Sequence, residues 1–152
     1  MTDRREQIIQ RLVAIAGTVV SPTRAFRNDT TITGKTGNAI VIWDGDEAVD
    51  AEAQPMRRRA DAPLLVEMTP ELRILREEPA ADLGTSLNTL RLSVISAVIT
   101  DALSGGTLAT LVGTNGHVRY DGPSTEMMPG RALEGALGVR FNIRYPLIFS
   151  EL

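Results

Sequence analysis

The chain contains no cysteine and only one histidine, His117. The lack of cysteine excludes disulfide bridges, thiolate metal ligands and cysteine nucleophiles. A histidine that works as a general base or metal ligand normally has partner residues, and His117 has no companion at a recognisable spacing. We therefore interpret His117 as a surface residue at the start of a strand.

Long apolar runs and an excess of basic charge are also missing. No apolar run approaches the ~18 residues of a membrane span, and the charged segment 1–6 lacks the apolar stretch of a signal peptide. We expect no membrane partner. The net charge of −3 is not that of a free-standing nucleic-acid binder. A length of 152 residues favours a single domain over 1–152.

The clearest positive signal is the alternation over 135–147. Apolar residues occupy every second position, and the positions between them include Arg140 and Arg144. Side chains of a strand point alternately to its two faces, so this segment predicts a long half-buried strand with one basic face. The apolar positions are Leu137, Val139, Phe141, Ile143, Tyr145 and Leu147.

A second alternating segment, 63–76, has an acidic face that contains Glu67 and Glu71. Pro70 interrupts it, and because proline cannot donate to a ladder we expect an edge strand or a bulge there. If this strand neighbours 135–147, the glutamates face Arg140 and Arg144. The two arginines then either pair within the sheet or face another subunit, and the sequence leaves both alternatives open.

Helical spacing of apolar residues predicts two main helices, over 3–16 with a stop at Gly17 and over 84–104. A short helix is expected over 108–112. Asp3 and Glu6 have the spacing of a capping box.

The remaining strands are expected over 19–27, over the uniformly apolar 39–43, and from His117 until Asp121-Gly122-Pro123 turns the chain. A loop over 123–134 then leads to the last strand. The order α-β-β-β-α-(α)-β-β predicts an α+β fold, with a mostly antiparallel five-stranded sheet and the two main helices packed on it.

The segment 44–62 is predicted to be a long charged loop, either solvated or used for interaction. Its acidic residues could attract a hard cation, but the spacing of a calcium loop is missing, so we favour a solvated turn. No catalytic signature occurs elsewhere, and no cofactor is expected. The charged residues that we take as candidate interface groups in this loop are Asp44, Asp46, Glu47, Arg57, Arg58 and Arg59.

Several segments together resemble the tail-terminator, or minor tail protein U-type, family of long-tailed bacteriophages and related prophage particles. The resemblance covers most of the chain and is carried by fold and turn motifs. They are the first helix ending near Gly17, the strand and acidic turn 39–47, Met68-Thr69-Pro70-Glu71, the helix start 87–91, Gly113–Gly116 with 118–122, and the strand 137–145.

The resemblance implies a non-enzymatic virion protein that is made in the host bacterial cytoplasm and located at the head–tail junction. Its subunits would form a ring, expected to be a hexamer, that caps the tail tube and ends tube polymerisation. The implied partners are other copies of the chain, the major tail tube protein and the head-completion or connector protein. DNA would only pass through the lumen.

Two other hypotheses remain. The first is a non-enzymatic adaptor or binding module outside a phage particle, or another head–tail neck protein. The second is an enzyme with an unrecognised site around Asp44, Asp46, Glu47 and His117. Because no catalytic signature was found in the sequence, this hypothesis is the weakest.

Replacing Arg57, Arg58 and Arg59 together with alanine tests the role of the loop. If the loop lies at a subunit interface or in the ring lumen, the triple variant should assemble more weakly than the unaltered chain while melting at the same temperature. Light scattering measures assembly and circular dichroism measures melting. Unchanged ring formation would count against an interface role.

Overall fold

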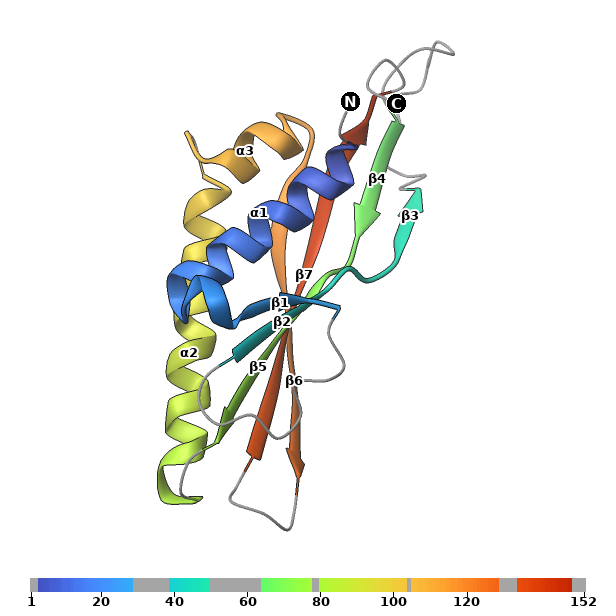
Figure 1. Ribbon diagram of the computed structural model, residues 1–152. Helices are drawn as coiled ribbons and strands as arrows, with labels where there is room; N and C mark the ends of the chain where they lie inside the picture. Colours follow the sequence, from blue (N-terminus) through green and yellow to red (C-terminus); the bar gives the residue numbers. More distant parts are fainter. Residues whose placement is uncertain are drawn as a thin grey trace.

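The α+β class is confirmed: over the residues that it describes, the computed structural model has three α-helices and a seven-stranded open sheet (Figure 1). The structure describes residues 3–28, 39–49, 64–77, 80–103, 105–128 and 134–148. In chain order the elements are α1 (Arg4–Val19), the 3₁₀ turn η1 (Pro22–Arg24), β1 (Ala25–Arg27), β2 (Ala39–Trp43), β3 (Glu47–Val49), β4 (Leu64–Met68), β5 (Glu71–Glu77), α2 (Ala80–Asp101), α3 (Thr107–Val112), β6 (His117–Met128) and β7 (Glu134–Leu147).

The sheet is organised around an antiparallel ladder between the segment 64–77 and β7. The register is the same from Leu64 opposite Leu147 to Glu77 opposite Glu134, so β4 and β5 act as one strand interrupted only at Thr69-Pro70. The two long alternating segments are therefore neighbours, as their complementary charges predicted. β6 pairs with the other side of β7.

Pro70 lies in the interior of the sheet, so its predicted edge position was wrong. Its carbonyl accepts a hydrogen bond from the Phe141 N–H at 3.1 Å, which continues the ladder to β7. On the other side, which the Thr69 N–H faces through its bond to the Asp46 carbonyl, three residues between β2 and β3 oppose the two residues between β4 and β5. The irregularity is thus a bulge in the neighbouring strand. We call these adjoining interruptions, 44–46 and 69–70, the crease.

The crease also explains why the sheet has seven strands in the described residues, whereas five were predicted. The predicted strand 63–76 is divided into β4 and β5, and β3 forms inside the segment predicted to be a loop, 44–62. Residues 50–62 lie outside the described part of the chain. One pairing, β1 with β2, is parallel, and the other five are antiparallel.

The helices differ from their predicted bounds at the ends. Asp3 caps α1 by accepting the Arg5 N–H, whereas Glu6, its expected partner in a capping box, accepts hydrogen bonds from Gln10 and Arg27. The helix continues past Gly17 to Val19. A Cβ at Gly17 would lie 3.1 Å from the Cα of Pro22, so this glycine allows the following turn to approach the helix. α2 begins at Ala80, four residues early. No helix in the described ranges is both long and apolar enough to cross a membrane.

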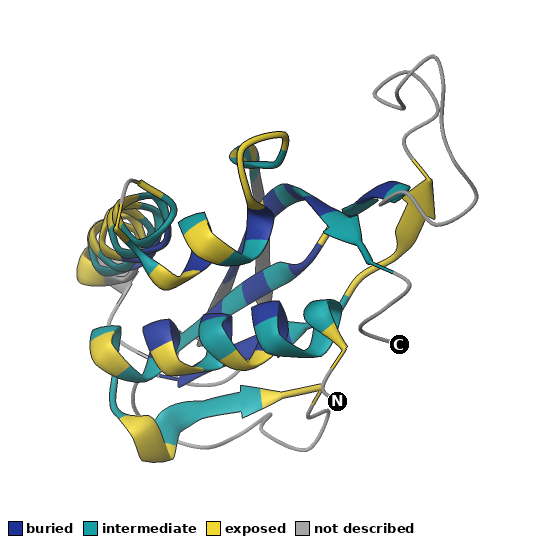
Figure 2. Cartoon of the chain, turned by 90° about the horizontal axis from the view of Figure 1, so that it is seen from above, coloured by how far each residue is buried: buried dark blue, intermediate teal, exposed yellow. Residues whose placement is uncertain are grey.

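One core joins the three helices to one face of the sheet. The alternating apolar residues of β7 from Leu137 to Tyr145 are all buried there, together with apolar residues of β2, β4 and β5. Figure 2 shows the buried side of α1 turned toward the strands and its exposed side turned outward. The helix-side face of the strands, α1, α2 and α3 therefore form two layers around a single core.

The opposite face of the sheet, which we call the open face, carries no helix in the described ranges. Around β2 this face holds a small apolar cluster, in which Ala39 and Val41 are buried against Phe26, Trp43 and Leu75. Over the rest of it, polar and charged side chains of β4, β5, β6 and β7 alternate with the core residues. The two faces therefore differ in chemistry.

The predicted turn at Asp121-Gly122-Pro123 and the loop after it were wrong in part. The segment forms a bulge, at which the register with β7 shifts between Tyr120 and Pro123, and β6 continues to Met128. Gly122 has a φ of 95°, which a side chain would disfavour. A bulge uses the same residue types as a tight turn, which is why the pattern was ambiguous.

Replacing Phe141 with alanine tests the core. The side chain is fully buried and contacts Tyr120 edge to face, with ring centroids 6.1 Å apart. We expect the free energy of unfolding to fall by about 3–5 kcal/mol, through lost apolar burial and the cavity left behind.

Urea denaturation of Phe141→Ala and of Leu92→Ala, which truncates an exposed apolar side chain of α2, measures this difference. The Leu92 variant should stay within about 0.5 kcal/mol of the unaltered chain. A Phe141 variant that keeps the original melting temperature would contradict the burial of this face.

Candidate functional site

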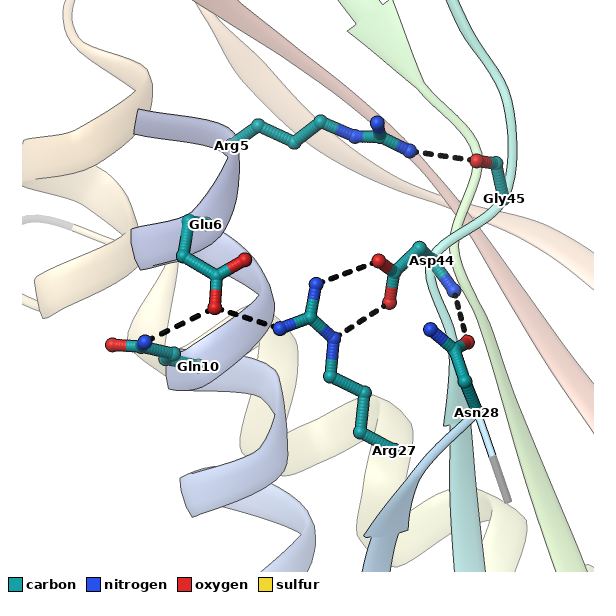
Figure 3. Close-up of polar contacts among 7 residues, drawn as sticks. All are labelled: Arg5, Glu6, Gln10, Arg27, Asn28, Asp44 and Gly45. Atoms are coloured by element: carbon teal, nitrogen blue, oxygen red, sulfur yellow. Dashed lines mark hydrogen bonds and ion pairs between the residues drawn. The ribbon is translucent and has the colours of Figure 1, made fainter. Parts of the chain in front are cut away.

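A charged cluster joins the start of α1 to the ends of β1 and β2 (Figure 3). Arg27, at the end of β1, donates two hydrogen bonds to Asp44, at 2.6 and 2.9 Å, and one to Glu6 on α1 at 2.7 Å. Asn28 accepts the Asp44 N–H at 3.3 Å. One guanidinium thus ties together three segments that are far apart in sequence.

The arginine also changes the acidity of its partners. Hydrogen bonds from Arg27 hold the pKa of Asp44 below its ordinary value of 3.8, against the opposing effect of partial burial. The same guanidinium lowers the pKa of Glu6 from 4.5. The pKa of Arg27 is raised in turn by the two carboxylates. All three groups are therefore charged at neutral pH, and this cluster offers no proton donor or acceptor for catalysis.

Next to this cluster, Gly45 brings the two interruptions of the crease, 44–46 and 69–70, into contact. It has a φ of 70°, and a Cβ there would lie 2.0 Å from the carbonyl oxygen of Thr69, so only glycine fits. The Arg5 guanidinium donates to the Gly45 carbonyl at 2.8 Å. Asp46 and Glu47 follow at exposed positions, and Glu47 accepts the hydroxyl of the buried Tyr145. The turn is therefore fixed by contacts with α1, β4 and β7.

The three acidic residues of this turn do not form a cation site. Asp44 is bound to Arg27, Glu47 accepts the Tyr145 hydroxyl, and the Asp46 carbonyl accepts the Thr69 N–H. Among the described residues, no three His, Cys, Asp or Glu side chains lie close enough to share a metal ion. What remains available at this corner is negative charge presented to solvent.

On the open face the structure gives the predicted arginines different surroundings. Glu71 lies directly opposite Arg140 in the ladder, and Glu67 lies opposite Arg144. Glu71, however, forms its ion pair with Arg73 on its own strand, at 3.4 Å. Arg144 donates to the carbonyl of Asn115 at 2.9 Å. Arg140 is exposed, and no ion pair among described side chains reaches it.

His117 belongs to a polar row across the open face. Its Nε2 lies 2.7 Å from Oδ1 of Asn142, whose amide donates to Glu67 at 3.3 Å. Because the Asn142 oxygen accepts, the Nε2 of His117 donates. Two strands, β7 and β4, separate His117 from β3, so about 14 Å of sheet lies between the histidine and Glu47. The sheet does not bring together the residues of the enzyme hypothesis.

A second ion pair, between two helices, could not be predicted from the residue pattern. Arg11 on α1 makes a bidentate contact with Asp101 at the end of α2, at 2.6 and 3.0 Å, and Asp101 also accepts the Leu108 N–H. The hydrogen bonds from Arg11 hold the pKa of Asp101 below 3.8. A shallow groove of about 420 Å³ beside this pair is lined by small side chains, and its two charged groups satisfy each other.

Of the residues predicted as an interface, Asp44, Asp46 and Glu47 lie at one corner and Arg140 and Arg144 on the open face, whereas Arg57, Arg58 and Arg59 lie outside the described residues. Sequence reasoning missed Glu6, Arg27 and Arg119. Glu6 was taken only as a cap residue, and a weak strand prediction hid Arg27. Arg119 alternates with Val118 and Tyr120, so a longer predicted strand would have placed it on the open face.

No protein-family model matches the chain, and no curated protein matches it either. The proposed function therefore rests on the geometry of the subunit and on the resemblance of its motifs.

Stability against acid tests the Arg27 cluster. The two carboxylates have lowered pKa values in the folded chain, so their contribution is present above their ordinary values of 3.8 and 4.5 and is lost as the pH falls through the folded values. Arg27→Gln should lower the free energy of unfolding at pH 7 by about 1 kcal/mol, since two partly exposed ion pairs are lost.

As the pH falls below 3.8 and the carboxylates take up protons, the difference between Arg27→Gln and the unaltered chain should shrink. Urea denaturation at pH 7 and at acid pH measures this change, and Arg91→Gln, which removes an arginine bonded to the neutral hydroxyl of Tyr120, is the control. An equal difference at both pH values would show that the ion pairs do not stabilise the fold.

Proposed function

We propose that this chain is a structural subunit that assembles into a ring at the end of a phage tail tube. In this role the ring, expected to be a hexamer, ends tube polymerisation and joins the tail to the head connector. The protein acts in the virion, at the head–tail junction, without catalysis or a cofactor. Its partners are its own copies, the major tail tube protein and the head-completion protein, and DNA passes through the lumen.

The observation that carries the proposal is the asymmetry of the sheet. One face is buried under three helices, whereas the open face presents charged side chains over the long ladder of 64–77 with β7. A head-to-tail ring needs two different surfaces on each subunit, because every contact joins unlike patches. The subunit offers such unlike surfaces, with the charged open face on one side and the outer surface of the helices on the other.

Further support comes from what the charged groups do. The acidic residues near β3 and the charged pairs between helices hold elements together, and their geometry has no nucleophile–base arrangement of the kind an enzyme needs. The motifs that resemble tail terminators, such as 68–71 and 137–145, coincide with the crease and with β7. The same residues thus support both the fold and the resemblance.

Light scattering on the purified chain, alone and with purified tail-tube subunits, tests the proposal. We expect the mass of a closed oligomer of about six subunits and, by negative-stain imaging, rings that bind tube ends and limit tube length. A strict monomer that never associates with tube ends would refute the proposal. An oligomer that ignores tube ends would favour an adaptor outside a phage particle.

A further inference from the structure

Arginines gather on the open face around one asparagine. Arg119 on β6 lies directly opposite Asn142 on β7, and Arg140 and Arg144 are the neighbours of Asn142 on the same face. Arg119 therefore has two arginines as diagonal neighbours, at roughly 7–8 Å. We call this surface the basic face, and it comprises Arg73, Arg119, Arg140 and Arg144 with Glu67 and Glu71.

The basic face holds more positive charge than its own carboxylates balance. Four arginines stand against the two glutamates and against Asp121, which lies in the bulge of β6 opposite Arg140, although the whole chain has a net charge of −3. Arg119 and Arg140 are exposed, and no ion pair among the described residues reaches either of them. These two arginines therefore present positive charge to solvent, which an acidic partner surface can meet.

A matching acidic surface exists on the same chain, at the corner where α1 begins and the crease separates β2 from β3. Asp46 and Glu47 are exposed there, beside the Arg27 cluster of Figure 3. This acidic corner comprises four carboxylates, of Glu6, Asp44, Asp46 and Glu47, against two arginines, Arg5 and Arg27. The excess charges of the two surfaces are opposite in sign.

The two surfaces cannot meet within one subunit. β6, at one edge of the sheet, carries Arg119 on the open face, whereas the acidic corner lies at the opposite edge, beside α1. We propose that the basic face of one copy docks onto the acidic corner of the next, forming the head-to-tail contact of the ring. This inference rests on the proposed function, because it names the surfaces through which that ring closes.

A second copy fits these observations better than a nucleic acid does. Glu67 and Glu71 are interleaved with the arginines and would repel a phosphate backbone, and Glu67 is held in place by Asn142. A folded protein surface, in contrast, can meet positive and negative groups at fixed positions. Binding to DNA is therefore an outcome that the test must be able to detect.

Charge reversal tests the contact in the full chain. The double variant Arg119→Glu, Arg140→Glu and the single variant Asp46→Lys should each weaken self-association at least tenfold, so that light scattering reports monomers where the unaltered chain is assembled. An equal mixture of the two variants should give dimers, because each retains one of the two surfaces. Asp82→Lys, at an exposed position of α2, is the matched control and should assemble normally.

Disulfide trapping provides a second readout, because the chain has no cysteine of its own. The double variant Asp46→Cys, Arg119→Cys should form covalent multimers under oxidation, resolved as a ladder on a non-reducing gel. The pair Asp46→Cys, Asp82→Cys should not. Unaltered melting temperatures would show that all variants are folded.

Assembly that survives both charge variants, or rings without a cross-link between positions 46 and 119, would overturn this contact while leaving the ring itself standing. Rings that cross-link as expected but fail to cap tail tubes would instead refute the tail function alone. Binding of a labelled duplex DNA by the unaltered chain, lost in Arg119→Glu, Arg140→Glu while assembly persists, would assign the basic face to nucleic acid.

Discussion

The fold depends on one backbone interaction, the antiparallel ladder between 64–77 and β7. Its register is the same from end to end, and because side chains alternate along a strand, this register decides which residues enter the core. A slip by one residue would turn Phe141 and Tyr145 outward and bring Arg140 and Arg144 under the helices. The buried helices, the charged open face and the separation of the two charged surfaces all follow from this pairing.

Much of this arrangement could be predicted from the sequence, because the strongest signals are local. The alternation in β7, the apolar run of β2 and the spacing in α1 each specified an element, and the matching charges of Glu67 and Glu71 identified the right neighbour for β7. Predictions failed where tertiary contacts outweigh local preference. Gly17 continues a helix because Pro22 packs against it, and the residues 121–123 form a bulge because β7 is long enough to continue the pairing.

The candidate surfaces were predictable only in part. The acidic turn and the arginines of β7 could be found from their spacing, but the partners of each charge depend on contacts between distant segments. Arg27 neutralises Asp44 across 17 positions, and Arg11 meets Asp101 across 90. A sequence shows which charged residues exist. Only the structure distinguishes those that form ion pairs within the subunit from those that remain exposed and available to a partner. Arg119 and Arg140 belong to the second group.

The crease has a consequence for how related chains can diverge. Gly45 tolerates no side chain because the carbonyl of Thr69 occupies that space, and this close approach belongs to the bulge that the extra residue in 44–46 creates. A homologue that loses this extra residue would restore a regular ladder and would no longer need glycine at position 45. Deletion within 44–46 and replacement of the glycine should consequently occur together.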